Sequence, residues 1–281
     1  MKKIILTLLA LVICVGCVSQ DNPIIDNPIK YDYINEEGSN ILTRINVPEG
    51  YKRVEVSDDS FGSYVRNYSL KEHDSPVLLY SGEEKGNQSG HVAVFDLPIE
   101  NEDLQQCADS IMRFYGEYYY AKKKYDKIAF HFVDGFHAVY SKWVEGYRIK
   151  VGQSSSKWVK SASYDDSYTS FKKFMRMVFA YSSTLSMNKE AKAIDIKDIQ
   201  IGDIFIKAGS PGHVVMIVDV CENEEGKKAF LLAQGFMPAQ QFHIIKNPRH
   251  EDPWYYEDEV TYPFYTISYT FEEGSLKRVM Y

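Results

Sequence analysis

Three residues of this sequence have the side chains that a cysteine-dependent acyl-transfer reaction requires. Cys107, His213 and Gln234 occur in that order along the 281-residue chain. A thiol can attack a carbonyl carbon, an imidazole can accept its proton, and a third polar group can hold the imidazole in one tautomer. The sequence therefore contains a candidate nucleophile, base and orienting group, which the fold must bring together.

The candidate nucleophile lies near the start of a predicted helix. The apolar residues that recur at helical spacing are Leu104, Cys107, Ala108, Ile111, Phe114, Tyr115 and Tyr118, and the polar residues in capping positions are Asn101, Glu102 and Asp103. The positive end of a helix dipole favours a thiolate over a thiol. This position predicts a reactive Cys107, although a buried and inert cysteine would fit the same pattern.

The candidate base and orienting group lie on predicted antiparallel strands. Strands are indicated over residues 203–207, 213–220 and 229–233, with turn-rich connections between them. Consecutive antiparallel strands place the start of one beside the end of the next, so we expect His213 and Gln234 to meet at one edge of the sheet. His91, in a similar Gly-His-Val context, is the alternative base.

The remaining pattern predicts a single α+β domain over residues 41–281 with an insert at about 126–165. A short helix is indicated around residues 60–66 and a longer one over 167–185. Residues 77–80 and 91–95 are predicted to be two strands joined by the turn 81–90. The insert alternates aromatic and polar groups, which is typical of β-hairpins or of an irregular segment. Helices followed by antiparallel strands indicate the α+β class.

The motifs around the three candidate residues resemble those of papain-like cell-wall cysteine peptidases and amidases of the NlpC and CHAP types. Gly202-Asp203, Gly212-His213-Val214 and Gln234 correspond to that pattern, and Cys107 corresponds to the nucleophile by its order in the chain. The resemblance implies a papain-like fold and cleavage of amide bonds in peptidoglycan-type peptides. We add Asp203, Trp143 and Trp254 as candidate substrate-binding residues, the two tryptophans as walls of a groove.

The body of the chain also resembles a bacterial lipoprotein-type family with a domain of unknown function, numbered 4846. The motifs that carry this resemblance include Gln106-Cys107-Ala108-Asp109, Tyr140-Ser141-Lys142-Trp143 and Gly209-Ser210-Pro211-Gly212-His213. This second resemblance covers more of the chain than the first, but it implies no activity.

The N-terminus predicts export. Met1-Lys2-Lys3 and the apolar run 4–15 are typical of a signal peptide, here residues 1–16, because the run is too short to span a bilayer. The end of the run, Val15-Gly16-Cys17, resembles a bacterial lipoprotein signal, which implies lipidation of Cys17. Residues 17–40 are polar and interrupted by prolines, so we predict a tether. We expect an exported protein anchored to the membrane of the cell envelope by this lipid.

Composition excludes several classes of function. Hydrophobic residues make up 44% and charged residues 25% of the chain, which is ordinary globular usage. A formal net charge of -7 argues against a nucleic-acid partner, because such proteins need a basic surface. The remaining histidines lack the spacing of zinc ligands, so we predict no metal site and no cofactor.

Two other interpretations stay open. A non-catalytic module on the same scaffold would bind glycans or a protein in the cell envelope through an aromatic-lined cleft. Alternatively, Cys107 and Cys221 would form a structural disulfide, since they are the only two thiols left once residues 1–16 are removed and Cys17 is lipidated.

Overall fold

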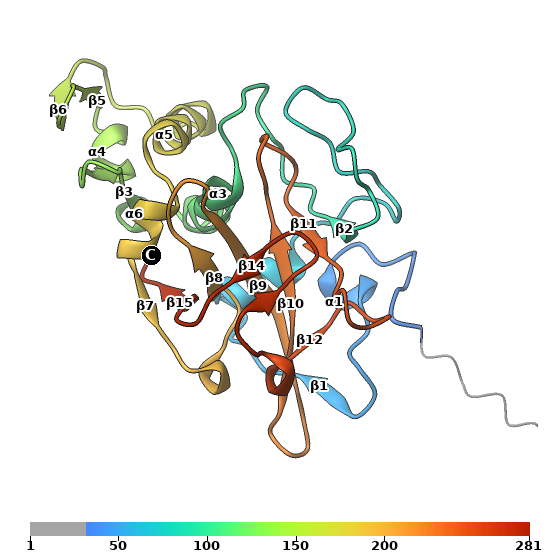
Figure 1. Cartoon of the computed structure of the whole chain (residues 1–281). Coiled ribbons are helices and arrows are strands. Elements are labelled where there is room, and N and C mark those ends of the chain that lie inside the picture. Colours follow the sequence, from blue (N-terminus) through green and yellow to red (C-terminus); the bar gives the residue numbers. More distant parts are fainter. Residues whose placement is uncertain (1–31) are drawn as a thin grey trace, which may run out of the picture. The chain divides into compact units, whose positions relative to one another are not determined.

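An antiparallel sheet of nine strands lies at the centre of the part of the chain that the computed structural model describes, residues 32–281 (Figure 1). The bounds of its strands are β1 (Tyr51–Arg53), β2 (His91–Val94), β7 (Ala191–Ala193), β8 (Ile204–Lys207), β9 (His213–Asn223), β10 (Lys228–Gln234), β11 (His243–Ile245), β12 (Tyr255–Tyr256) and β15 (Leu276–Val279). The main order is β2-β11-β10-β9-β8-β15-β7, while β1 pairs with β9 and β12 pairs with β10.

Six α-helices, three short 3₁₀ helices and three two-stranded hairpins complete the regular structure of the described residues. The helices are α1 (Ile41–Arg44), α2 (Phe61–Asn67), α3 (Cys107–Ala121), α4 (Tyr140–Val144), α5 (Tyr168–Tyr181) and α6 (Thr184–Lys189). The hairpins are β3 (Ala129–His131) with β4 (His137–Val139), β5 (Tyr147–Val151) with β6 (Ser156–Lys160), and β13 (Phe264–Tyr265) with β14 (Thr270–Phe271). Among these residues, no helix has the length and apolar character that a membrane span needs.

The predicted α+β class and the three strands that carry the candidate site are confirmed. The observed β8, β9 and β10 match the predictions within a few residues at each end, and the helix predicted around Cys107 is α3. The prediction of a strand at residues 77–80 paired with β2 is wrong. Leu78 and Leu79 form only isolated bridges, to Glu84 and Gln240, whereas β2 pairs with β11. The strand that pairs with β2 is therefore β11, which lies about 150 residues later in the chain, and not the neighbouring segment 77–80.

The two faces of the sheet are covered by different parts of the chain. Residues directly opposite each other in an antiparallel pair share a face. Lys207 lies opposite His213, so Phe205 and His213 are on one face, and the Phe205 ring packs against Phe264 and Phe271 of the β13–β14 hairpin. Figure 1 shows β14 in front of the central strands and α2 and α3 behind them. The candidate base and the helix of the candidate nucleophile therefore belong to different layers.

The predicted insert contains two β-hairpins, whereas part of the predicted tether belongs to the folded domain. Residues 126–165 contain the hairpins β3–β4 and β5–β6 with α4 between them. The tether was predicted too long, because residues 32–40 already pair with the domain: Ile34 bridges Ile45, and Asn35 N–H donates to the Arg44 carbonyl. The predicted signal peptide and Cys17 lie outside the described residues.

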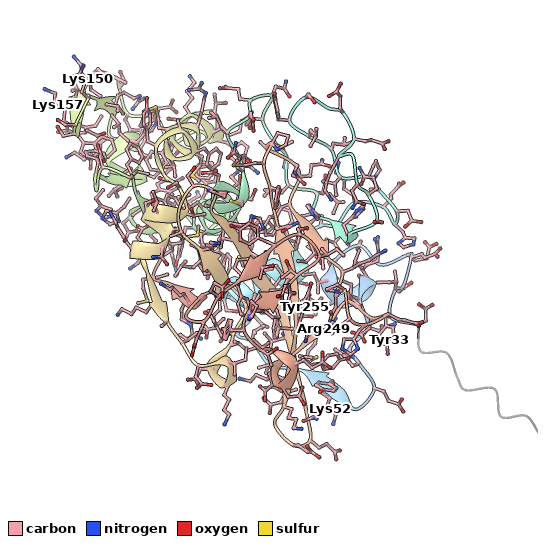
Figure 2. The ribbon with its side chains drawn as sticks, viewed as in Figure 1. Tyr33, Lys52, Lys150, Lys157, Arg249 and Tyr255 are labelled. Atoms are coloured by element: carbon pink, nitrogen blue, oxygen red, sulfur yellow. The ribbon has the colours of Figure 1, made fainter. Side chains whose placement is uncertain are left out.

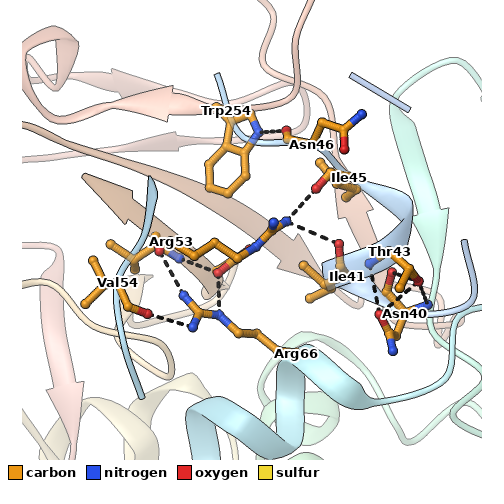
Figure 3. A network of polar contacts seen from close by, with 11 residues as sticks. Asn40, Ile41, Thr43, Ile45, Asn46, Arg53, Val54, Arg66 and Trp254 are labelled. Carbon is orange, nitrogen blue, oxygen red and sulfur yellow. Dashed lines mark hydrogen bonds and ion pairs between the residues drawn. The ribbon is translucent and has the colours of Figure 1, made fainter. Parts of the chain in front are cut away.

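A buried carboxylate ties the N-terminal part of the domain to β9. Asp219 is fully buried and accepts hydrogen bonds from Arg53 Nε and Arg66 Nε, both at 2.7 Å. The two guanidinium groups also donate to backbone carbonyls, including that of Val54 (Figure 3). Arg53 lies on β1 and Arg66 on α2, so one side chain of β9 fixes an edge strand and a helix.

Replacement of Asp219 by alanine is expected to lower the free energy of unfolding by about 3–5 kcal/mol, because it leaves two partly buried cations without their shared partner. Urea denaturation at neutral pH measures this loss. The exposed Asp58 provides a control, since Asp58→Ala should change the same quantity by less than about 0.5 kcal/mol. Equal effects of the two substitutions would show that the Asp219 network contributes nothing specific.

Candidate functional site

Cys107 is the first residue of α3 and is almost buried, with 7% of its surface exposed. Backbone N–H groups of the first helical turn have no partner within a helix, so they are free to face an atom at the helix start. Three backbone N–H groups lie near the sulfur and favour its thiolate, those of Ala108, Val214 and Cys107 itself. Val214 belongs to β9 and directly follows His213, so the sulfur lies one peptide away from the candidate base.

The direction of the Val214 N–H shows on which side of β9 the Cys107 sulfur lies. Ile217 exchanges backbone hydrogen bonds with the segment that leads into β8, and alternate residues of a strand point their N–H groups to opposite sides. The Val214 N–H therefore points away from β8, towards β10. The last β10 pair before this point is Ala233 with Met216, so the sulfur occupies the gap between the start of β9 and the end of β10.

The His213 ring contacts the last residue of β10. Its Nε2 is 2.8 Å from Gln234 Oε1, so the prediction that these two residues meet at the strand ends is confirmed. The ring approaches from the β13–β14 side, where it contacts the Phe236 and Tyr269 rings. No hydrogen bond joins the ring to the Cys107 sulfur among the described residues. The ring lies on the β13–β14 side of the sheet and does not line the cavity beside Cys107, whereas the sulfur lies beside the N–H of Val214, the residue that follows His213.

The network behind Gln234 fixes the tautomer of the candidate base. Gln234 Nε2 donates to Ser268 Oγ at 2.9 Å and faces His243 Nε2 at 3.5 Å, while His243 Nδ1 donates to the Gln241 carbonyl at 2.8 Å. With the Gln234 amide held this way, its Oε1 must accept, so His213 Nε2 carries a proton. His213 Nδ1 is then the lone-pair nitrogen, which is the form that a general base needs.

Burial keeps the site uncharged at neutral pH. Burial, and then the nearby Asp109, raise the pKa of Cys107 to about 11, and the backbone N–H groups offset only part of this. Burial likewise lowers the pKa of His213 to about 4, against a smaller opposing effect of its hydrogen bond to Gln234. The expectation that the helix dipole favours a thiolate is therefore outweighed by desolvation, and the resting pair is a thiol and a neutral imidazole.

A cavity of about 180 Å³ opens beside Cys107. Its walls are the start of α3, the start of α6, the loop 209–212 and Met237, and it contains no lysine, arginine or histidine side chain. Asp109 lines it with a carboxylate oxygen, Oδ1, that is buried and has no hydrogen-bond partner. Burial raises the pKa of Asp109 well above its ordinary value. The cavity is smaller than most small-molecule sites and fits a short side chain or acyl group.

The other predicted site residues are structural in this fold. Trp143 is buried and donates from Nε1 to Ser170 Oγ, and Trp254 is fully buried and donates to the Asn46 carbonyl (Figure 3). Neither tryptophan lines the Cys107 cavity, so the prediction of groove walls is wrong. Asp203 is buried and forms an ion pair with Arg278, at 2.7 Å, which corrects its predicted role in substrate binding.

The alternative base and the proposed disulfide are also corrected. His91 lies on β2, three strands away from β9 in the sheet order, and its Nε2 contacts the Ser75 carbonyl at 3.1 Å. Its ring packs edge-on against that of His243, with centroids 6.1 Å apart, and it does not line the cavity beside Cys107. Cys107 and Cys221 are both free thiols, and Cys221 is fully buried near the opposite end of β9 from His213. A bridge between the two cysteines is therefore excluded.

Three residues of the site escaped the sequence prediction. Asp109 is visible as an acid one half-turn after Cys107, but the sequence pattern assigns it no role in the site. His243 pairs with Gln234 in the β10–β11 ladder, and Ser268 comes from the β13–β14 hairpin. Nothing in the local pattern around Ser268 signals its contact with Gln234, because that contact depends on how a hairpin packs across the sheet.

Cation binding is not indicated at this site. No group of three or more histidine, cysteine, aspartate or glutamate side chains in residues 32–281 has an arrangement that could hold a metal ion.

The fold and the site define an α+β protein in which a helix-borne cysteine packs against the strand that carries the histidine of a histidine–glutamine pair. The family model described as Domain of unknown function (4846), DUF4846, matches residues 41–278 of the chain, which therefore belongs to this family. The sequence resemblance to this family is thus confirmed. No curated protein and no solved structure matches the chain.

Proposed function

We propose that this protein is a cysteine-dependent amidase or peptidase with a papain-like arrangement of Cys107, His213 and Gln234. The observation that supports it most is the 2.8 Å contact of Gln234 Oε1 with His213 Nε2, on a strand whose next residue, Val214, has its N–H beside the Cys107 sulfur. Such a set of nucleophile, base and orienting group is the minimum that acyl transfer through a thiol requires.

The reaction would start from the neutral pair. As the sulfur bonds to the substrate carbonyl carbon, the thiol proton passes to His213 Nδ1, and the carbonyl oxygen becomes an oxyanion. Backbone N–H groups at the start of α3, including that of Cys107, stabilise this oxyanion. The imidazolium then returns the proton to the leaving amine as the carbon–nitrogen bond breaks. Water, deprotonated by His213, then bonds to the thioester carbon. The carbon–sulfur bond breaks, the imidazolium returns the proton to the Cys107 sulfur, and the acid is released.

The proposed substrates are amide bonds of peptides in the cell envelope, of the peptidoglycan type. The predicted signal peptide and the predicted lipid at Cys17 support this location, since they would hold the domain on a membrane outside the cytoplasm. The small cavity beside Cys107 would accept a short side chain next to the cleaved bond, and its acidic lining would favour a neutral or amine-bearing group.

Digestion of purified peptidoglycan tests the proposal. The full protein is incubated with intact peptidoglycan and with soluble muropeptides, and the products are identified by mass spectrometry. We expect fragments that correspond to hydrolysis of an amide bond, with a gain of one water per cleavage. Absence of such products, with a folded protein and a free Cys107 thiol confirmed in the same sample, would rule out this activity.

Gln234 should act as a positioning residue. Gln234→Ala frees the imidazole to adopt the wrong tautomer and should lower kcat by roughly 10²-fold, the order of a general-base contribution. Gln234→Glu keeps an acceptor at Nε2 and should restore most of the rate. Its carboxylate favours the imidazolium, so the acidic limb of the kcat profile should move to higher pH. Loss of rate in both variants without any shift of that limb would indicate a structural role only.

The alternative function is a non-catalytic envelope-binding module for a glycan or a protein. The observation that favours it is the burial of Cys107, with its raised pKa, because an inert cysteine is commonly buried. This alternative predicts that Cys107→Ala leaves binding to peptidoglycan intact in a pull-down assay and that no cleavage products form. The mass-spectrometric assay above separates the two functions.

A further inference from the structure

A second and larger cavity, of about 630 Å³, lies between the insert and the C-terminal residues. Its walls come from the 3₁₀ helix η1 (Tyr125–Lys127), from β3 and the start of β4, from α6, and from residues 280 and 281. The volume is within the usual range for sites that enclose a small molecule. The proposed reaction at Cys107 makes no use of this cavity.

Helix α6 separates the two cavities. Its first residue, Thr184, lines the cavity of Cys107, and its last residue, Lys189, lines the larger one. Six helical residues rise by about 9 Å, so the two spaces are close but distinct.

Two buried polar groups that interact with each other, the Glu190 carboxylate and the Tyr281 hydroxyl, belong to residues that line the larger cavity. Glu190 accepts hydrogen bonds at Oε1 from His131 Nδ1, at 2.6 Å, and from the His131 N–H, at 3.0 Å, while its Oε2 is buried and has none. The Tyr281 hydroxyl is also buried without a hydrogen bond of good geometry, although it lies close to the Glu190 carboxylate. Buried polar atoms whose hydrogen bonds are incomplete cost free energy, which a bound ligand with hydrogen-bond donors would recover.

The rim of the cavity carries unpaired positive charge. Lys127, Lys189 and Lys192 line it and are exposed, and none of the three forms an ion pair with another residue of the described chain. Asp126 is the one acid among the exposed lining residues. In a chain whose net charge is -7, this local excess of lysines is suited to an anionic group at the mouth of the cavity.

The walls between floor and rim are apolar and aromatic. Phe132 and Met280 line the cavity, and the imidazoles of His131 and His137 stack with centroids 4.5 Å apart. Flat rings of this kind cover the less polar faces of a sugar or a peptide backbone.

We propose that this cavity binds a small carboxylate-bearing ligand, with the carboxylate at the lysine rim and hydroxyl or amide donors at Glu190 Oε2 and the Tyr281 hydroxyl. A sugar acid and the carboxyl end of a short peptide share this chemistry. The site goes beyond the amidase function, and its occupation does not depend on catalysis at Cys107.

Calorimetric titration of the full protein with matched probes tests the site. N-acetylmuramic acid and N-acetylglucosamine differ in the lactyl carboxylate, and dialanine and its C-terminal amide differ in the peptide carboxylate. We expect one of the two acids to bind with a dissociation constant below about 1 mM, and its neutral counterpart to bind at least tenfold more weakly. The acid that binds identifies the source of the carboxylate.

Variants of exposed lysines locate the bound ligand. Lys189→Ala with Lys192→Ala should weaken binding of the acid at least tenfold and leave the thermal midpoint unchanged. Lys150→Ala with Lys157→Ala is the matched control, since these exposed lysines lie at the outer end of the β5–β6 hairpin and should leave binding unchanged (Figure 2). Failure of both acids to bind, equal binding of neutral and acidic probes, or equal loss in the control would overturn the proposal. Each of these readouts is independent of amide cleavage.

Discussion

Cys107→Ala is expected to abolish amide cleavage and to leave the protein folded. Removal of the nucleophile leaves only the contribution of substrate binding and oxyanion stabilisation, so kcat should fall by roughly 10⁴-fold or more. The side chain makes no hydrogen bond with another side chain of the described residues and fills little volume, so the loss of stability should be of the order of 1 kcal/mol. Product formation by mass spectrometry and a urea titration measure the two effects.

The rate of alkylation of the Cys107 thiol and the rate of amide cleavage should depend on pH in different ways. With a pKa of about 11, the free thiol should react with iodoacetamide about tenfold faster for each unit of rising pH. Amide cleavage should not follow this slope, because His213 is neutral above about pH 4 and takes the proton within the complex. Cys221→Ala is the control, since Cys221 is fully buried and far from the site. Cleavage that persists in Cys107→Ala would refute the assignment of the nucleophile.

The protein is expected to lose stability between about pH 6.5 and pH 4 through its buried histidines. Burial lowers the pKa of His213 to about 4 and that of His243 to about 3, from an ordinary value of about 6.5. The folded state therefore binds fewer protons than the unfolded chain in this range. The stabilising contribution is fully present above pH 6.5 and falls as the pH decreases towards the folded values. At pH 4.5 each histidine accounts for a loss of roughly 2–3 kcal/mol.

Histidine variants separate the pH-dependent loss of stability due to the buried histidines from the opposite effect of the buried carboxyl groups. Burial raises the pKa values of Asp109, Glu190 and Asp252, which stabilises the folded state as the pH falls and opposes the histidines. His243→Gln removes one histidine and keeps these groups. The stability of the variant relative to the native protein should improve by about 2 kcal/mol between pH 7.5 and pH 4.5. The exposed His250→Gln controls for substitution of a histidine, and a constant difference for His243→Gln across the range would contradict the prediction.

The parts of the fold that sequence pattern predicted are those set by local periodicity. Runs of β-branched and apolar residues between turns fix β8, β9 and β10, and helical spacing fixes α3 with Cys107 at its start. The meeting of His213 and Gln234 follows from their positions at a strand start and a strand end, because the connection between antiparallel strands is short.

The roles of single side chains were predicted less well, because they depend on packing between distant segments. Trp143 and Trp254 are large aromatic residues suited to a groove, yet both are buried by elements that the local pattern does not link to them. Asp203 matches a motif position but pairs with Arg278 on β15. The segment around Leu79 bridges Gln240 instead of β2, since the hydrogen-bond partners of a short strand are chosen by the whole sheet.

The sequence by itself determined the α+β class, the family, the order of the central elements and the residue types of the candidate site. Only the tertiary structure decided which layer each side chain occupies and how charged it is. Desolvation depends on every atom packed around a group, so it reversed the predicted preference of Cys107 for the thiolate. The same packing placed His243 and Ser268 behind Gln234 and enclosed the lysine-rimmed cavity beside α6, neither of which a one-dimensional pattern contains.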